Sequence, residues 1–341
     1  MSAPSPPMFT PQAREVALSL GLVMGRTNLE VFADTLLMLA KQNRAVIAVT
    51  SDSRGSGKLG PFGQSLPEQI VEVGIAEQNL VGVAAGLASA GKIVFAVSPA
   101  CFLSARSLEQ VKNDICYSDM PVKLVAISSG VSYGALGSTH HSLHDVAALR
   151  AINNIDIVVP ADNFEAQQAI TLAAEHKRPI YLRFGKAAMY SLPSPATQGD
   201  RAGESAFAIG KARVLRDGHD LCFIANGETV IHALLAAEHL KQRSISARVI
   251  SMHTIKPLDT AAILTAANDC RAIITVEEHM IHGGLGEACA SLLLQAGLSP
   301  KFAIVGFPDE YTVTGAQADI FRHYGISMEG LGAVAAELLA R

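Results

Sequence analysis

Residues 73–97 read VGIAEQNLVGVAAGLASAGKIVFAV and contain a unit that recurs along the chain. The Gly- and Ala-rich part, Ala76–Ala90, predicts a helix. The part that follows, Lys92–Val97, is short, apolar and β-branched, which is typical of a buried strand. Because a fully apolar strand must be covered on both faces, its alternation with helices predicts a parallel sheet between two layers of helices.

The same alternation extends on both sides of this unit. Further strands are expected at Ala45–Thr50, Val122–Ser129, Ile155–Val159 and Pro179–Phe184, and helices at Leu103–Tyr117 and Asn163–His176. The run Met189–Ser205 is rich in Pro, Ser, Gly and charge and interrupts the pattern, as an interdomain linker does.

Beyond the linker the pattern restarts. Strands are expected at Asp220–Ala225, Ala247–Met252, Arg271–Val276 and Phe302–Phe307, and helices at Glu228–Arg243 and Leu258–Ala267. The sequence therefore predicts an α/β fold in two domains. We expect an N-terminal tail at 1–24, a parallel-sheet domain at 25–190, a linker at 191–205 and a smaller α/β domain at 206–341.

The composition excludes several classes of function. The 341 residues are 49% hydrophobic and 17% charged, with a net charge of −4, which argues against binding to nucleic acid or to an anionic membrane. No apolar run reaches the roughly 18–20 residues that cross a bilayer, and the N-terminus lacks the layout of a signal peptide. The five scattered cysteines are expected to be buried thiols. A cytoplasmic protein is therefore expected.

The segment GIAEQN at 74–79 carries the first candidate site residue. Ligands bind at the carboxyl ends of parallel strands, and Glu77 opens an otherwise apolar helix, where a buried carboxylate is costly without a partner. A first-turn acid favoured by the helix dipole is the alternative. The segment closely resembles the pyrimidine-binding domain of transketolases and 1-deoxyxylulose-phosphate synthases. The resemblance implies a catalytic Glu77 that binds N1′ of thiamine diphosphate and activates it to attack a ketose carbonyl.

The segment after the strand Lys92–Val97 holds the next two candidates. The resemblance implies that Phe102 stacks on the cofactor's pyrimidine ring, a contact worth roughly 1 kcal/mol. Simple core packing is the alternative for Phe102. Arg106 could pair with substrate or with a neighbouring subunit, and we group it with Phe102 and Glu77 as a cofactor-side residue.

The polar loop 132–145 follows the strand Val122–Ser129 and contains a Gly-x-Thr-His core. The resemblance implies that His140 is catalytic and contacts a sugar hydroxyl or the reacting carbonyl, and we expect the adjacent His141 to contact the substrate as well. Transketolases usually have Glu-Asp-Gly before Thr-His and Gln after it, whereas this chain has Ala-Leu-Gly at 135–137 and His141. This departure indicates a less common sugar. His140, His141 and His144 lack a dedicated metal-ligand spacing, so no metal ligand is predicted.

Cations and a serine form the remaining candidate set. Lys186 takes the position at which the family carries a phosphate-binding Arg, and Arg183 lies three residues earlier. Arg26 and Ser56 also resemble phosphate-contacting positions, although each taken alone is typical of an exposed surface. We therefore expect Arg26, Ser56, Arg183 and Lys186 to bind a sugar phosphate, together with His140 and His141.

A missing motif indicates a partner. The family holds the cofactor's diphosphate through Mg²⁺ with a Gly-Asp-Gly motif, and the sequence contains none. The chain thus resembles the C-terminal section, or small subunit, of a split transketolase. The resemblance implies an α2β2 assembly whose partner subunit supplies the Mg²⁺ ligands. It also implies a mainly architectural transketolase C-terminal domain after the linker.

Two other interpretations remain open from the sequence. The β subunit of a 2-oxo acid dehydrogenase has the same two domains and a similar carboxylate. The Thr-His loop and the cations Arg183 and Lys186 favour a sugar phosphate instead. The other alternative is a non-catalytic flavin-binding or scaffold subunit, which would have no use for Glu77 in an apolar helix.

Overall fold

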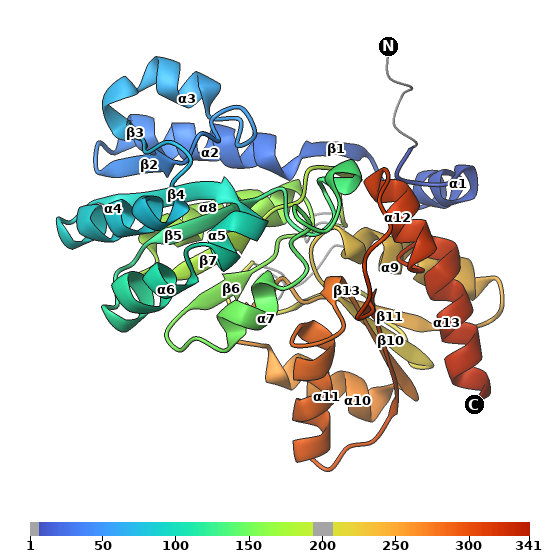
Figure 1. Ribbon diagram of the computed structural model, residues 1–341. Coiled ribbons are helices and arrows are strands. Elements are labelled where there is room, and N and C mark those ends of the chain that lie inside the picture. Colours follow the sequence, from blue (N-terminus) through green and yellow to red (C-terminus); the bar gives the residue numbers. More distant parts are fainter. Residues whose placement is uncertain (1–6, 194–206) are drawn as a thin grey trace.

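The computed structural model describes residues 7–193 and 207–341, which fold around two main β-sheets (Figure 1). The first sheet has seven strands in the order β12-β6-β7-β5-β4-β2-β3, and all neighbours are parallel except the β12–β6 pair. Its strands are β2 (Val46–Thr50), β3 (Ile70–Glu72), β4 (Ile93–Pro99), β5 (Lys123–Ile127), β6 (Asp156–Val158), β7 (Ile180–Arg183) and β12 (Thr254–Lys256).

Helices cover both faces of the first sheet. In β2, Val46 and Ala48 pack with one group of helices, and Ile47 and Val49 pack with the other. The first group is α2 (Asn28–Gln42), α3 (Gly60–Ser65) and α8 (Asn163–Glu175). The second includes α4 (Glu77–Ser89), α5 (Ala100–Ala105) and α7 (Asp145–Arg150). The parallel sheet between two helical layers is confirmed.

The expected helix Leu103–Tyr117 is not continuous. Helix α5 begins earlier, at Ala100, and is followed by the short α6 (Leu108–Gln110) and a π-helical segment (Val111–Tyr117). The hydroxyls of Ser104 and Ser107 donate to backbone carbonyls four residues earlier. Such bonds compete with the regular helical pattern and bend helices. This local bonding accounts for three short segments in place of the single expected helix.

The second sheet has the order β14-β13-β10-β11-β9, with β9 as an antiparallel edge. Its strands are β9 (Arg213–Arg216), β10 (Leu221–Ala225), β11 (Ala247–Ser251), β13 (Ala272–Met280) and β14 (Lys301–Phe307). One face packs on α9 (Thr229–Lys241), α12 (Gln317–His323) and α13 (Met328–Ala340), and the other on α10 (Thr260–Asp269) and α11 (Leu285–Gln295).

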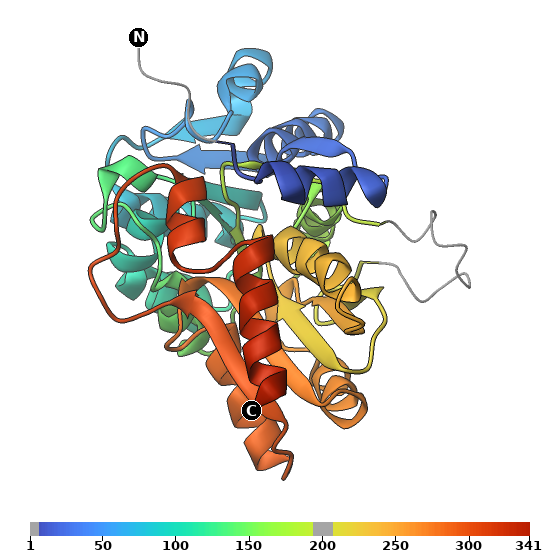
Figure 2. The same cartoon turned by 90° about the vertical axis from the view of Figure 1, so that its right-hand side faces the viewer.

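The two halves are joined by elements that cross between them. Strand β12 lies beyond the linker in sequence but extends the first sheet next to β6. Helix α1 (Pro11–Ser19), within the expected N-terminal tail, packs on the C-terminal half beside α9 (Figure 2). Strands β1 (Met24–Thr27) and β8 (Ala188–Tyr190) form a separate antiparallel pair. Most of the expected linker lies outside the described residues, and the domain boundaries stay a prediction.

Candidate functional site

Glu77 is the first residue of α4 and is buried, with 2% of its surface exposed. The chain reaches it from β3 through a turn at Gly74, whose φ of +71° favours glycine. Arg106 donates from Nη1 to Oε2 of Glu77 at 2.6 Å. Within the described residues, no donor is within hydrogen-bonding distance of Oε1 of Glu77. One carboxylate oxygen therefore remains free to bind a ligand.

Arg106 and Phe102 lie beside this carboxylate. The guanidinium carbon of Arg106 is 4.7 Å from the centroid of the Phe102 ring, and its side chain is 45% exposed. Phe102 is half-buried, and its ring meets the ring of His140 edge-on at 5.4 Å. A substrate or another subunit was the expected partner of Arg106, but its partner in the structure is Glu77 of the same chain. The structure thus brings Glu77, Phe102, Arg106 and His140 together.

His140 is held by its own loop. Its Nδ1 hydrogen-bonds with the hydroxyl of Thr139 at 2.9 Å, and its ring lies 5.7 Å from that of Tyr133. These contacts leave Nε2 without a partner among the described residues. A half-buried imidazole with one free nitrogen beside Phe102 can bind a polar ligand group.

His141 has a different environment, although it is adjacent in sequence. It is 4% exposed, and its Nε2 is 3.0 Å from the carbonyl oxygen of Gly134 while Nδ1 is 2.8 Å from the hydroxyl of Thr312. Burial lowers the pKa of His141, which favours the neutral ring. Both ring nitrogens have partners within the protein, so His141 connects its loop to the segment after β14 by hydrogen bonds. The placement does not support the expected substrate contact.

Arg183 is also buried, with 3% of its surface exposed. Its Nε donates to Oδ2 of Asp145 at 2.7 Å, and its Nη2 donates to the carbonyl oxygens of Ser142 and Glu278, each at 2.9 Å. Burial alone would raise the pKa of Asp145, but the charges of Arg183 and His279 and the hydrogen bonds from Arg183 and Tyr181 together outweigh it, and the pKa is lowered. The expectation of a phosphate contact is corrected here, because Arg183 joins the two halves internally.

Lys186 is exposed at the expected strand-end position. Its ammonium lies 4.6 Å from the centroid of the Tyr133 ring, and the same ring also contacts His140. Partial burial, reinforced by the charge of Lys58, lowers the pKa of Lys186. Lys186 therefore provides a cation near the His140 loop.

Arg26 and Ser56 are both exposed, and their expected phosphate contacts stay predictions. Arg26 is exposed and donates to Oδ2 of Asp34 at 2.8 Å. Ser56 is exposed on the loop after β2, and its hydroxyl has no partner among the described residues. Nor does any group of three or more His, Cys, Asp or Glu side chains in residues 7–193 and 207–341 form a possible metal site.

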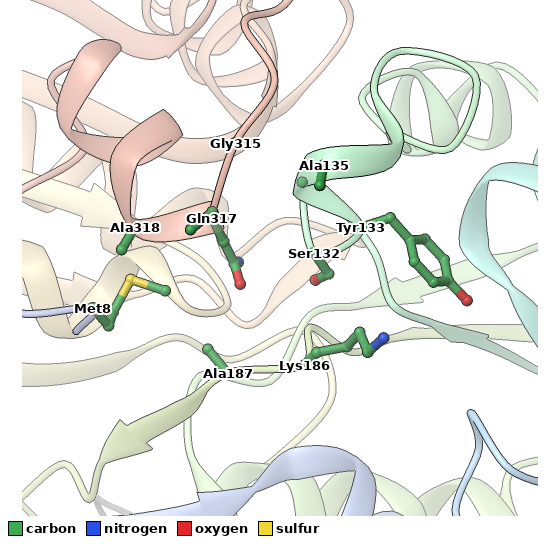
Figure 3. Close-up of a pocket in the computed structure, with 11 residues that line it drawn as sticks. Met8, Ser132, Tyr133, Ala135, Lys186, Ala187, Gly315, Gln317 and Ala318 are labelled. Carbon is green, nitrogen blue, oxygen red and sulfur yellow. The ribbon is translucent and has the colours of Figure 1, made fainter. Parts of the chain in front are cut away.

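A cavity of about 590 Å³ lies between the two halves, and of its lining residues only Lys186 was among the residues predicted from the sequence (Figure 3). Behind it, Gln317 donates from Nε2 to Glu228 at 2.7 Å and to Glu278 at 3.0 Å. Burial, and then mutual repulsion, raises the pKa of Glu228 to about 8, and burial raises that of Glu278 to about 7. The sequence did contain one indication of these buried acids. Glu277 and Glu278 follow each other inside an apolar strand, where burying a carboxyl group is costly unless it has a function or a partner.

Comparison with known proteins assigns the family. Residues 25–190 match the pyrimidine-binding domain of transketolase, and residues 210–331 match the transketolase C-terminal domain. The chain is 47% identical over 310 residues to an apulose-4-phosphate transketolase subunit of Phocaeicola vulgatus, covering 91% of this chain and 96% of that protein. The chain belongs to the transketolase family.

Two further members are similar along most of their length. A putative transketolase C-terminal section of Methanocaldococcus jannaschii is 36% identical, covering 88% of this chain and 92% of that protein. A solved structure described as a split-gene transketolase, inactive beta4 tetramer, superposes with a TM-score of 0.80 at 32% identity, covering 93% of this chain and 99% of that one. The predicted thiamine-diphosphate-dependent transketolase subunit, a transferase, is confirmed over the dehydrogenase and scaffold alternatives. None of the described helices is long and apolar enough to cross a membrane.

Proposed function

We propose that Glu77 is the cofactor-activating carboxylate of this transketolase subunit. The observation that carries the proposal is a buried carboxylate with one oxygen fixed by Arg106 and the other free, beside the half-buried ring of Phe102. These groups fit an aminopyrimidine, which has a ring nitrogen to share a proton with a carboxyl and a flat face to stack. When bound, thiamine diphosphate supplies the nucleophilic carbon that carries a two-carbon ketol unit between sugars.

Each residue of this group has a role that follows from its contacts. Glu77 shares a proton with the pyrimidine nitrogen through Oε1, while Arg106 fixes the plane of the carboxyl by holding Oε2. Phe102 offers its ring face to the pyrimidine. His140, oriented by Thr139, contacts the reacting carbonyl or a hydroxyl through its free Nε2. A donor placed where negative charge develops stabilises the transition state.

The substrate is proposed to carry an anionic end. Lys186 is the cation best placed to bind it, since Arg183 is used internally and Arg26 would first have to leave Asp34. Ser56 stays a prediction as a further contact. One relative is named for apulose 4-phosphate, and another, 34% identical over 82% of this chain and 87% of its own length, is a 6-deoxy-6-sulfo-D-fructose transketolase subunit of a Clostridium species. Both names agree with an uncommon ketose that bears an anionic group.

The other half of the site is proposed to lie on a partner subunit. The chain has no Gly-Asp-Gly motif, and several of its relatives are named as single subunits of a transketolase. A similar β-only tetramer is described as inactive. We infer that the partner supplies the ligands for Mg²⁺ and the diphosphate and that two copies of each subunit form an α2β2 assembly. Cytoplasmic location stays a prediction.

Calorimetry tests the divided site. Thiamine diphosphate with Mg²⁺ is titrated into the purified chain and then into its mixture with the subunit that carries Gly-Asp-Gly. Because this chain binds only the pyrimidine, we expect weak binding by the chain alone. The mixture should bind tightly and transfer the two-carbon unit. Tight, Mg²⁺-dependent binding by the chain alone would refute the divided site.

A further inference from the structure

The cavity between the two halves has polar groups from both. Its wall includes Ser132 and Tyr133 from the His140 loop, Lys186 after β7, and Gly315 and Gln317 at the start of α12. Figure 3 shows Gln317 and Ser132 pointing into the same space from opposite sides. The C-terminal half therefore contributes directly to a cavity that Lys186 also lines, with its ammonium turned toward the Tyr133 ring.

Gln317 presents one particular atom to this space. Its Nε2 donates to both Glu228 and Glu278, and neither acid lines the cavity. An amide nitrogen has only two N–H donors, so both are used and the amide cannot flip without losing two hydrogen bonds. Oε1 has no partner in the part of the chain that the structure describes. Gln317 is thus a fixed acceptor for a hydroxyl group.

Ser132 supplies a second unused group. Its Oγ is buried and has no hydrogen-bond partner among the described residues. A buried hydroxyl without a partner is unfavourable, because no hydrogen bond offsets its loss of contact with water. Rotation between staggered positions can turn this hydroxyl toward a ligand in the cavity that Ser132 lines.

Lys186 adds a positive charge to these neutral groups. Its ammonium rests against the ring of Tyr133, whose other neighbour is His140. Tyr133 therefore contacts both the cation and the imidazole that is assigned to the reacting carbonyl. An acceptor, a hydroxyl and a cation around one cavity suit a small ligand that has both hydroxyls and an anionic group.

We propose that the interdomain cavity binds the hydroxylated, anionic end of the substrate and that Gln317 and Ser132 determine which sugar is accepted. This inference rests on the proposed function, because it assigns the occupant to the same reaction. It makes the C-terminal half part of substrate recognition and not only architecture.

Binding of a simple probe to the full chain tests the site without the cofactor. Glycerol 3-phosphate combines hydroxyls with an anion, and inorganic phosphate and glycerol each carry one part. Saturation-transfer NMR should give the tightest binding for glycerol 3-phosphate. Ser132→Ala and Gln317→Leu should each weaken it roughly three- to tenfold and leave inorganic phosphate nearly unchanged. Lys186→Ala should weaken both phosphates equally.

The controls separate a lost contact from a lost fold. Gln295→Leu changes an exposed glutamine on α11, whose amide donates to the hydroxyl of Ser291, and should leave every probe unaffected. Ser132→Ala removes a hydroxyl that has no internal partner among the described residues, so it breaks no bond seen in the chain. Unchanged affinity for glycerol 3-phosphate in both Ser132→Ala and Gln317→Leu would overturn the proposal, as would equal affinity for inorganic phosphate and glycerol 3-phosphate.

The reconstituted enzyme distinguishes substrate from a separate effector. If the cavity holds the substrate's far end, glycerol 3-phosphate inhibits competitively, and Ser132→Ala raises KM for the ketose roughly three- to tenfold while kcat stays unchanged. Non-competitive inhibition would contradict the assignment to substrate. If the proposed function is wrong, the wild-type reconstituted enzyme will show no cofactor-dependent transfer. The probe-binding experiment does not depend on that result, so the two failures can be distinguished.

Discussion

Arg106 donates to the carboxylate of Glu77 over 2.6 Å, and only Glu77 of this pair is buried. The guanidinium is therefore the partner that makes an ionised carboxylate tolerable at the start of an apolar helix. The contact uses Oε2 and orients the carboxyl so that Oε1 stays free of partners within the described residues. The pair links stability to function, because the group that stabilises Glu77 also positions it.

Removing Arg106 should therefore destabilise the chain through Glu77. We expect Arg106→Ala to lower the free energy of unfolding by about 1–3 kcal/mol, since it leaves a buried carboxylate without its charged donor. Urea denaturation measures this. In a Glu77→Gln background the same change should have little effect. An equal loss in both backgrounds would show that Arg106 acts through Phe102 packing instead.

Arg183 should be essential for stability. Arg183→Met removes one partner of a buried pair and leaves Asp145 without its cationic partner, which costs about 3–5 kcal/mol. Arg26→Ala breaks an exposed pair with Asp34 and should cost about 0–1 kcal/mol in the same denaturation experiment. Similar losses for the two variants would contradict the placement of Arg183 as an internal bridge.

Lys186 should discriminate between charged and neutral sugars. In the reconstituted enzyme, Lys186→Ala should weaken a phosphorylated ketose by roughly 1–3 kcal/mol, which is the value of a charge-assisted contact. The unphosphorylated sugar should be nearly unaffected in steady-state kinetics. Lys92→Ala, an exposed lysine just before β4, is the matched control and should change neither. Equal losses for both sugars in Lys186→Ala would exclude the phosphate role.

The pair Glu228 and Glu278 should make stability depend on pH. Burial raises the two pKa values to about 8 and about 7 from an ordinary value of 4.5, so the folded chain holds protons that the unfolded chain releases. Their contribution is full below pH 4.5 and is lost as pH rises through about 7–8. Glu228→Gln should flatten the fall in melting temperature over this range, and the exposed Glu337→Gln should not. If the melting temperature of Glu228→Gln depends on pH as it does in the wild type, the raised pKa of Glu228 is contradicted.

The elements that the sequence predicted well are those fixed by local pattern. The apolar run Ala45–Thr50 became β2, and GIAEQN placed Glu77 at the start of α4, because periodicity and composition act over neighbouring residues. The errors involve partners that are distant in sequence. Arg183 has the features of a strand-end cation until Asp145 and the carbonyl of Glu278 are placed around it.

The contribution of the C-terminal half to the interdomain cavity was beyond prediction for the same reason. Gln317 is fixed by Glu228 and Glu278, which are distant in sequence and meet it inside the C-terminal half, and the cavity wall is completed only where this half packs against the His140 loop. Likewise, His140 and His141 are adjacent in sequence, but contact with Thr312 buries only the second. The packing of the C-terminal half against the His140 loop therefore makes His141 structural and leaves His140 available to a ligand. The local sequence does not predict this difference.

The exchange rate of the C2 proton of bound thiamine diphosphate tests the central role of Glu77 most directly. In the reconstituted enzyme, rapid-quench NMR compares wild type with Glu77→Gln, and Glu109→Gln, an exposed acid on α6, serves as the control. We predict that Glu77→Gln binds the cofactor and folds normally but exchanges this proton far more slowly, with turnover lost in parallel, while Glu109→Gln matches wild type. Exchange at the wild-type rate in Glu77→Gln would contradict the assignment of Glu77 as the activating carboxylate.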